Sequence, residues 1–151
     1  MNKNRKTIRL KEYNYSQCGE YFITICSKDR RYIFGEIKED KIILSKYGEI
    51  AENTLSRIKQ NKSIEIDNYI IMPNHIHMII EIKYDKIVNL KDLISTYKSI
   101  TTKQINKEQK IIVWQRNYYE HIIRDENEKE EIIKYIRYNP INWDRDNLKI
   151  K

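Results

Sequence analysis

Two histidines separated by one residue are the feature of this sequence most able to do chemistry. They are His75 and His77, in the segment MPNHIH. If this segment is a β-strand, residues i and i+2 lie on one face, about 6.6 Å apart along the strand. Two neutral imidazoles placed in this way can bind one divalent cation. The alternative is a half-buried polar stripe on a strand, without a metal.

A tyrosine and an asparagine near the C-terminus could complete such a site. Tyr135 and Asn139 are four residues apart in a helix-like segment, so they are neighbours one turn apart. Helical geometry places both at the edge of the apolar stripe formed by Ile132, Ile133 and Ile136. If this stripe packs over the histidines, the amide could bind the metal and the phenol could act as a nucleophile. The alternative is a tyrosine at the edge of the core and an asparagine that caps the helix before a proline.

The elements that must position these residues follow from the spacing of apolar residues and from turn signals. Runs of β-branched and aromatic residues predict strands, and apolar residues at intervals of three and four predict helices. Pro73–Asn74, between two apolar runs, predicts a tight turn. In chain order we expect a strand at 21–26, a hairpin at 32–44 that turns near Glu39–Asp40, a helix at 45–61, and strands at 64–72 and 75–82. A helix at 90–107 follows, with Asn89 as its N-cap, and then a strand at 113–123. The last helix opens at Asp125, with Glu128 as a capping-box partner, and stops at Asn139–Pro140.

The order of these elements predicts an α+β fold of the ferredoxin-like type. Without the early hairpin and the final helix the order is βαββαβ, which normally gives an antiparallel sheet with two helices on one face. The run 75–82 would then be a central strand, with Ile76, Met78 and Ile80 toward the two helices. Both histidines would lie on the open face, where the C-terminal helix is the natural cover. We expect a single domain over residues 1–151, with 1–12 as a basic N-terminal arm.

The charge of the chain favours a polyanionic partner. Lysine and arginine number 29 against 22 aspartate and glutamate, a net charge of +7. Each phosphate that such a surface neutralises releases counterions, which drives binding to nucleic acid. The 12 tyrosines and 2 tryptophans could stack on exposed bases, although most of the tyrosines are expected to be half-buried strand residues. The alternative source of the charge is a codon bias toward lysine, asparagine and isoleucine.

Several function classes are excluded by composition. The 3 glycines are too scattered for a phosphate-binding glycine-rich loop, and the 2 cysteines, eight positions apart, do not form a zinc knuckle. No apolar run approaches the roughly 18 residues of a membrane span, so we expect no membrane partner and a cytoplasmic protein.

Three segments of the chain together resemble a known family of DNA-processing enzymes. They are YIIMPNHIHMII, VWQRNYYEHIIRDE and YIRYNP, and the likeness extends from about Tyr21 to Trp143. The family is that of the single-tyrosine HUH transposases, in the insertion-sequence-200-like superfamily and its REP-associated tyrosine transposase branch. The resemblance implies a ferredoxin-like sheet with the tyrosine on a C-terminal helix, in agreement with the order of elements.

The resemblance also implies an activity. Members of the family cut and rejoin single-stranded DNA, often near hairpin-forming palindromes, with Mg²⁺ or Mn²⁺. Carried over to this chain, His75, His77 and Asn139 are metal ligands, and Tyr135 is the nucleophile that forms a 5′-phosphotyrosine. One tyrosine performs one attack at a time, so transposition is expected to need a homodimer or sequential use of one subunit. Two alternatives are a relative that binds DNA hairpins without cutting them, and a metal-dependent nuclease in which water attacks.

Other residues near these segments compete for roles in the site. The rival tyrosines are Tyr118 and Tyr119 on the predicted last strand, which have no ligand four residues further on, and Tyr138, which lies further from the apolar stripe of the final helix. Candidates to flank the site are Tyr119, Glu120 and His121, with a satisfied strand histidine as the alternative for the last. Candidates for DNA contacts are Trp114, Gln115, Arg116 and Arg124, with a structural role as the alternative for the WQR segment.

Overall fold

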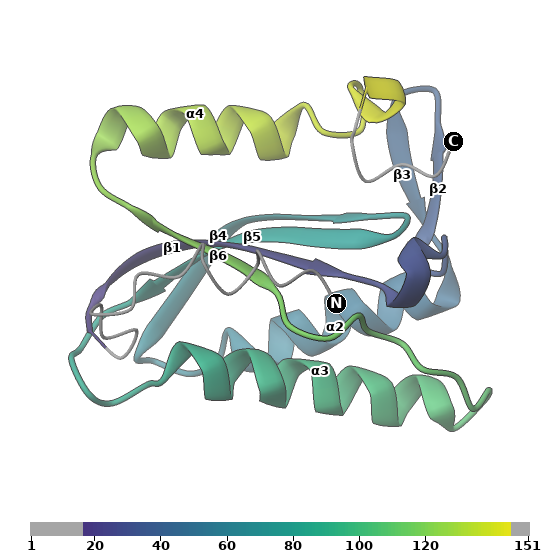
Figure 1. Cartoon of the computed structure of the whole chain (residues 1–151), viewed down its shortest axis with the longest axis horizontal. Helices are drawn as coiled ribbons and strands as arrows, with labels where there is room; N and C mark the ends of the chain where they lie inside the picture. The colour runs from purple at the N-terminus through teal and green to yellow at the C-terminus, as the bar shows by residue number, and fades with distance from the viewer. Residues whose placement is uncertain (1–16, 146–151) are drawn as a thin grey trace.

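The computed structural model describes residues 17–145, which form a four-stranded antiparallel sheet with helices on both faces (Figure 1). The expected basic arm at 1–12 lies outside the described residues. None of the helices between residues 17 and 145 combines the length and apolarity that crossing a membrane requires. The elements are β1 (Gly19–Cys26), the 3-10 turn η1 (Lys28–Arg30), β2 (Gly35–Lys38), β3 (Lys41–Leu44), α2 (Lys46–Ile58), β4 (Ile64–Met72), β5 (His75–Ile82), α3 (Leu90–Asn106), β6 (Tyr119–Ile123), α4 (Glu126–Arg137) and the 3-10 turn η2 (Trp143–Arg145).

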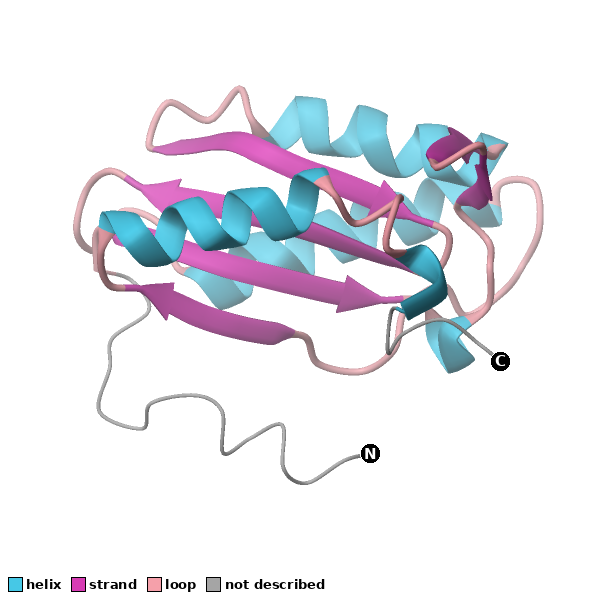
Figure 2. Cartoon of the chain, turned by 90° about the horizontal axis from the view of Figure 1, so that it is seen from above, coloured by secondary structure: helices cyan, strands magenta, loops and turns pink. Residues whose placement is uncertain are grey.

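The sheet has the strand order β4-β5-β1-β6, which confirms the predicted ferredoxin-like topology. The two central strands, β1 and β5, are antiparallel, with Cys26 opposite His75 and Thr24 opposite His77. Helices α2 and α3 cover one face, and α4 crosses the other (Figures 1 and 2). The histidine strand therefore lies in the middle of the sheet, under α4.

Strand alternation divides the side chains of β5 between the two faces as predicted. Ile76, Met78 and Ile80 are fully buried in the core between the sheet and helices α2 and α3. The two histidines point to the opposite face, toward α4. The core thus holds β5 rigidly from one side while the chemistry-bearing side chains project from the other.

The predicted turns and helix caps are also confirmed. The β2–β3 hairpin turns at Glu39 and Asp40, whose φ values of 52° and 61° lie in the left-handed region that a two-residue hairpin turn of type I′ requires. The Asp92 N–H donates to Asn89 Oδ1 at 3.2 Å, which caps α3. Helix α4 begins after Asp125, whose Oδ1 accepts from the Glu128 N–H at 2.8 Å. The Glu128 carboxylate accepts from the Arg124 N–H, one residue before the position that a capping box predicts.

The last strand is shorter than predicted. The sequence predicts a strand over 113–123, whereas β6 is Tyr119–Ile123 and Trp114 makes only an isolated bridge to Ser27. The interruption is at Asn117, whose φ of 66° is incompatible with extended backbone. The carbonyls of Gln115 and Asn117 accept from the Lys98 ammonium of α3, at 3.0 and 2.7 Å, instead of from a strand.

Gly48, in the first turn of α2, is required by a close approach of two segments. A Cβ at this position would overlap the carbonyl oxygen of Phe34, a backbone atom that cannot move away cheaply. We therefore expect Gly48→Ala to lower the free energy of unfolding by about 1–3 kcal/mol, as overpacking does. Urea unfolding measures this, with Asn53→Ala on the exposed side of the same helix as the control. Equal stability of the two variants would contradict the close approach.

Candidate active site

The two histidines of β5 are buried beside each other beneath α4. His75 is 0% exposed and His77 is 2% exposed, and their ring centroids are 4.6 Å apart. Burial, and then the neighbouring His75, hold the pKa of His77 well below its ordinary value. His77 is therefore a neutral imidazole at neutral pH, which is the form that binds metals.

One nitrogen of His77 is oriented by the sheet and the other is unpartnered. Its Nδ1 lies 2.8 Å from the Oγ1 of Thr24, the residue opposite on β1. The ring of Phe22 stacks on the imidazole at a centroid distance of 5.4 Å. Within residues 17–145 the buried Nε2 of His77 has no hydrogen-bond partner. A fixed ring with an unsatisfied buried nitrogen is a site prepared for a ligand.

His75 is oriented by the turn that precedes it. The Asn74 Nδ2 donates to the Arg30 carbonyl at 3.2 Å, so the Asn74 Oδ1 faces the His75 Nδ1, at 2.7 Å. An acceptor at this position holds the proton on Nδ1 and leaves the lone pair on Nε2. The Nε2 atom lies 3.3 Å from the Oδ1 of Asn139. In this tautomer the Nε2 lone pair faces the Asn139 oxygen, and a cation bound between them would be favourable.

Asn139 reaches the histidines from just beyond the helix. Helix α4 ends at Arg137, with Tyr138 as its C-cap, and the Asn139 N–H donates to the Ile136 carbonyl at 3.3 Å. Pro140 disfavours helical backbone at Asn139, which explains the stop. Asn139 is buried, so its amide is held at His75.

Tyr135 lies over His77 and is open to solvent. The centroid of its ring is 5.1 Å from that of His77 and 6.3 Å from that of Phe22, which it meets edge to face. Its side chain is 48% exposed. A phenol that packs on the rings of His77 and Phe22 and is open on its other side is accessible to a large substrate.

The structure thus brings together four residues that the sequence singles out, from β5, α4 and the residues just after α4. Two buried imidazoles and one amide oxygen are groups that could serve as donors to a cation. No group of three or more histidine, cysteine, aspartate or glutamate residues suited to a metal occurs within residues 17–145. A cation here would have few protein ligands and open coordination positions, as a catalytic rather than a structural metal site has.

Four residues that support this site are missing from the sequence predictions. They are Phe22, Thr24, Asn74 and Trp143; the last stacks on His75 at a centroid distance of 6.1 Å. Thr24 and Phe22 become visible once β1 is paired with β5, because both alternate onto the histidine face. For Trp143, which follows the helix stop, the sequence contains no signal.

The three residues predicted to flank the site are divided between the two faces of the sheet. Tyr119 lies on the site face, with its ring 6.1 Å from that of Phe22, and burial raises the pKa of Tyr119. His121 lies on the same face, and its Nε2 is 2.9 Å from the Glu128 carboxylate on α4, so it joins β6 to that helix. Glu120 is opposite Ile23 and 3% exposed, on the core face away from the histidines.

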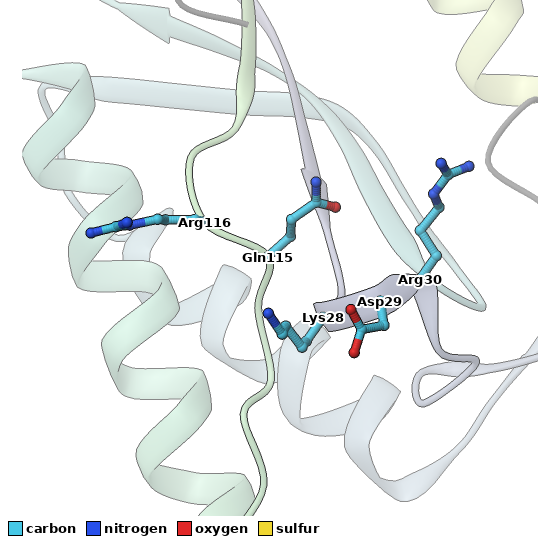
Figure 3. A pocket seen from close by; sticks show the side chains of 5 residues that line it. All are labelled: Lys28, Asp29, Arg30, Gln115 and Arg116. Carbon is cyan, nitrogen blue, oxygen red and sulfur yellow. The ribbon is translucent and has the colours of Figure 1, made fainter. Parts of the chain in front are cut away.

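Trp114 packs in the interior of the protein, whereas the other residues predicted to contact DNA are more exposed to solvent. It is buried, with ring centroids 5.1 Å from Phe34 and 5.9 Å from Tyr97. Arg124 is exposed before α4, and its N–H donates to the Glu128 carboxylate. Gln115 and Arg116 line an open pocket (Figure 3). Of the rival tyrosines, Tyr118 is buried in the core and Tyr138 is exposed at the end of α4.

Comparison with known sequences gives one family and several relatives. Residues 14–139 match the family described as "Transposase IS200 like". An uncharacterized protein of Haemophilus influenzae is 38% identical over 96% of this chain and 93% of its own length. A putative REP-associated tyrosine transposase of the same organism is 25% identical, over 85% of this chain and 73% of the relative. The REP-associated tyrosine transposase of Escherichia coli is 22% identical, over 84% and 69%.

Two solved structures have a similar fold. One is a REP-associated tyrosine transposase bound to a REP hairpin, with a TM-score of 0.70 and 20% identity over 89% of this chain and 73% of that chain. The other is a putative transposase from Deinococcus radiodurans, with a TM-score of 0.53 and 14% identity over 85% of this chain and 96% of that chain. The ferredoxin-like arrangement with an added helix is therefore the fold of these proteins.

Proposed function

The chain belongs to the IS200-like transposase family, and from this premise we propose that it cuts and rejoins single-stranded DNA with Tyr135 as the nucleophile. The observation that carries the proposal is the unpartnered, buried Nε2 of His77 beside an exposed tyrosine. Most buried polar side-chain atoms in proteins have a hydrogen-bond partner, so an unsatisfied imidazole nitrogen beside a second histidine favours a ligand.

The residues present fit a divalent cation, Mg²⁺ or Mn²⁺. The Nε2 atoms of His75 and His77 and the Oδ1 of Asn139 would hold it, and both Nδ1 atoms already have oriented partners. When bound, the cation would supply positive charge that polarises the scissile phosphate. Neutral imidazoles and an amide leave that charge undiminished, because none of them is an anion.

The residues of the chain then account for cleavage and rejoining. The Tyr135 oxygen attacks the phosphorus, the bond from phosphorus to the 3′ oxygen breaks, and the phenolic proton ends on that oxygen. The products are a 5′-phosphotyrosine and a free 3′-OH. Because no water takes part, a second 3′-OH can attack the phosphotyrosine and restore a phosphodiester. The buried ring of His77 and the half-buried ring of Phe22 hold the phenol at one place through both steps.

The proposed substrate is single-stranded or hairpin DNA. The net charge of +7 favours a polyanion, and a structural relative is a transposase bound to a REP hairpin. Each chain has one tyrosine in the site, so the two cuts of a transposition event would require a homodimer or sequential use of one subunit.

A covalent adduct tests the proposed function directly. The chain is incubated with labelled single-stranded and hairpin oligonucleotides and Mg²⁺ or Mn²⁺, then separated on a denaturing gel. We expect a labelled band that migrates with the protein and disappears with EDTA. Cleaved DNA without an adduct would identify a nuclease that uses water. Bound DNA without cleavage would identify a hairpin-binding relative, and either result would overturn the proposal.

Thr24 should control the metal affinity of His77 without touching the metal. Thr24→Val keeps the shape of the side chain but removes the oxygen that faces Nδ1. We expect Mn²⁺ affinity to fall about 10–100-fold, as it does when a partner of a metal-binding histidine is lost. Thr24→Ser keeps the hydroxyl and should bind Mn²⁺ nearly as the original chain does. Unchanged Mn²⁺ affinity in the valine variant would show that this hydrogen bond does not prepare His77.

A further inference from the structure

An open pocket with an excess of positive charge lies at the end of β1, outside the site described above. It has a volume of about 560 Å³ and contains three cationic side chains, one carboxylate and one amide. The lining residues are Lys28, Asp29, Arg30, Gln115 and Arg116, shown in Figure 3. They come from two segments far apart in the sequence, η1 and the stretch before β6. The proposed chemistry of Tyr135 uses none of them.

One wall of the pocket is a strained and firmly held turn. Asp29 and Arg30 have φ values of 56° and 53°, in the left-handed region that non-glycine residues rarely occupy. The Lys28 N–H donates to the Val113 carbonyl at 2.9 Å, and the Arg30 N–H to the Ser27 carbonyl at 3.1 Å. Strained backbone of this kind persists only where the surrounding structure fixes it, and it is concentrated at functional sites.

The opposite wall is fixed by a lysine of α3. The Lys98 ammonium binds the carbonyls of Gln115 and Asn117, which keeps the backbone on both sides of Arg116 in place. The Gln115 N–H donates to the Cys26 carbonyl at 2.9 Å. The pocket is therefore preformed on both sides, although its cationic side chains can still adjust to a ligand.

Two of the cations have no anionic partner. Within residues 17–145 neither the Lys28 ammonium nor the Arg116 guanidinium forms an ion pair. A concave surface that gathers unpaired cations raises the local concentration of anions. Arginine and lysine together are a common pair of phosphate ligands in nucleic-acid interfaces.

The pocket is close to the histidines but does not overlap them. Cys26 is opposite His75 on one side and bonded to Gln115 on the other. Gln115 is therefore two strand spacings from His75, about 10 Å. In Figure 3 the amide of Gln115 points to the side of the sheet where α4 lies. A second hollow, of about 720 Å³, shares Gln115 and Arg116 and continues along α3.

We propose that this pocket binds a backbone phosphate of the single-stranded DNA next to the scissile phosphate. Lys28 and Arg116 would be the ligands of that phosphate, with the Arg116 side chain, which extends toward α3 in Figure 3, turned toward Lys28 in the complex. The proposal rests on the proposed function, because it takes the DNA strand to be the substrate of the same protein. It adds a second phosphate site, which would set the register of the strand over Tyr135.

The test measures DNA binding without cleavage. All proteins carry Tyr135→Phe, and binding of a labelled single-stranded oligonucleotide is followed by fluorescence anisotropy between 50 and 200 mM salt. The test variant adds Lys28→Gln and Arg116→Gln. The matched control adds Lys62→Gln and Arg57→Gln, two exposed cations near the start of β4, at the opposite end of the sheet from the histidines.

The two double variants should differ in their salt dependence. Each phosphate contact to a single strand contributes about 0.7 to the slope of log K against log salt, so the test variant should lose about 1.4. Raising the salt from 50 to 200 mM should therefore reduce the affinity of the test variant by a factor about seven times smaller than the factor for the parent. The control should keep the slope of the parent. Circular dichroism should be unchanged in both, since the replaced side chains lie at the surface.

A neutral methylphosphonate, moved along the oligonucleotide, locates the contact. A methylphosphonate at one position beside the cleavage point should weaken DNA binding by the parent but not by the test variant. Equal slopes for parent and test variant, or equal losses in test and control, would overturn the phosphate site. So would weak binding by the parent with no salt dependence. The adduct assay with Tyr135 present is separate, so a changed slope without any adduct would remove the proposed function and leave the phosphate site standing.

Discussion

Replacing Tyr135 by phenylalanine is expected to abolish the covalent DNA adduct while the protein still folds and binds DNA. The substitution removes one oxygen, and the phenyl ring keeps its contacts with His77 and Phe22. The loss should be on the order of 10⁴-fold or more in rate, as for other nucleophiles removed from a prepared site. A denaturing gel measures the adduct, and anisotropy measures DNA binding.

Tyr138→Phe is the matched control for this prediction. Tyr138 is on the same helix end and is exposed to the same degree, 47% against 48% for Tyr135. Within residues 17–145, the rings next to those of His75 and His77 are those of Phe22, Tyr135 and Trp143, and not that of Tyr138. Adduct formation should therefore be normal in Tyr138→Phe. An adduct that persists in Tyr135→Phe would move the nucleophile to another residue.

Replacing His77 by alanine is expected to remove Mn²⁺ binding and adduct formation together. The remaining donors would be one imidazole and the Asn139 amide, which rarely hold a labile divalent ion. We expect Mn²⁺ affinity to fall by more than about 100-fold, a larger loss than for an orienting partner alone. The electron paramagnetic resonance signal of free Mn²⁺ gives the affinity without relying on activity.

His121→Ala is the control for the loss of a histidine. His121 contacts Glu128 rather than the other histidines, so this variant should bind Mn²⁺ normally. Circular dichroism separates loss of the metal from loss of the fold in His77→Ala, because a buried side chain is removed. Normal Mn²⁺ binding by a folded His77→Ala protein would contradict the proposed metal site.

Much of the fold could be predicted because the local signals agree with the tertiary structure. The alternation of β5 determines which side chains face the core, so one assignment places both His75 and His77 correctly. Asn89 and Asp125 mark helix starts by a side-chain hydrogen bond that depends only on nearby residues. Pro140 marks a helix stop for an equally local reason.

The parts that could not be predicted depend on contacts between distant segments. The segment 113–118 has the composition of a strand, but Lys98 of α3 takes its carbonyls and Asn117 turns the chain. Thr24 and His77 are 53 residues apart, and only strand pairing reveals that they bond. The position of Glu120 is different, because it could have been predicted. Alternation along the strand places Glu120 on the opposite face of the sheet from Tyr119.

In the proposed function, Tyr135 forms a covalent bond to a 5′ phosphate. Mass spectrometry of the trapped adduct tests it most directly, after digestion of the protein to peptides and of the DNA to a single attached nucleotide. The proposed function predicts that the nucleotide is attached through phosphate to Tyr135. Attachment to Tyr118, Tyr119 or Tyr138, or cleaved DNA with no modified peptide, would contradict it.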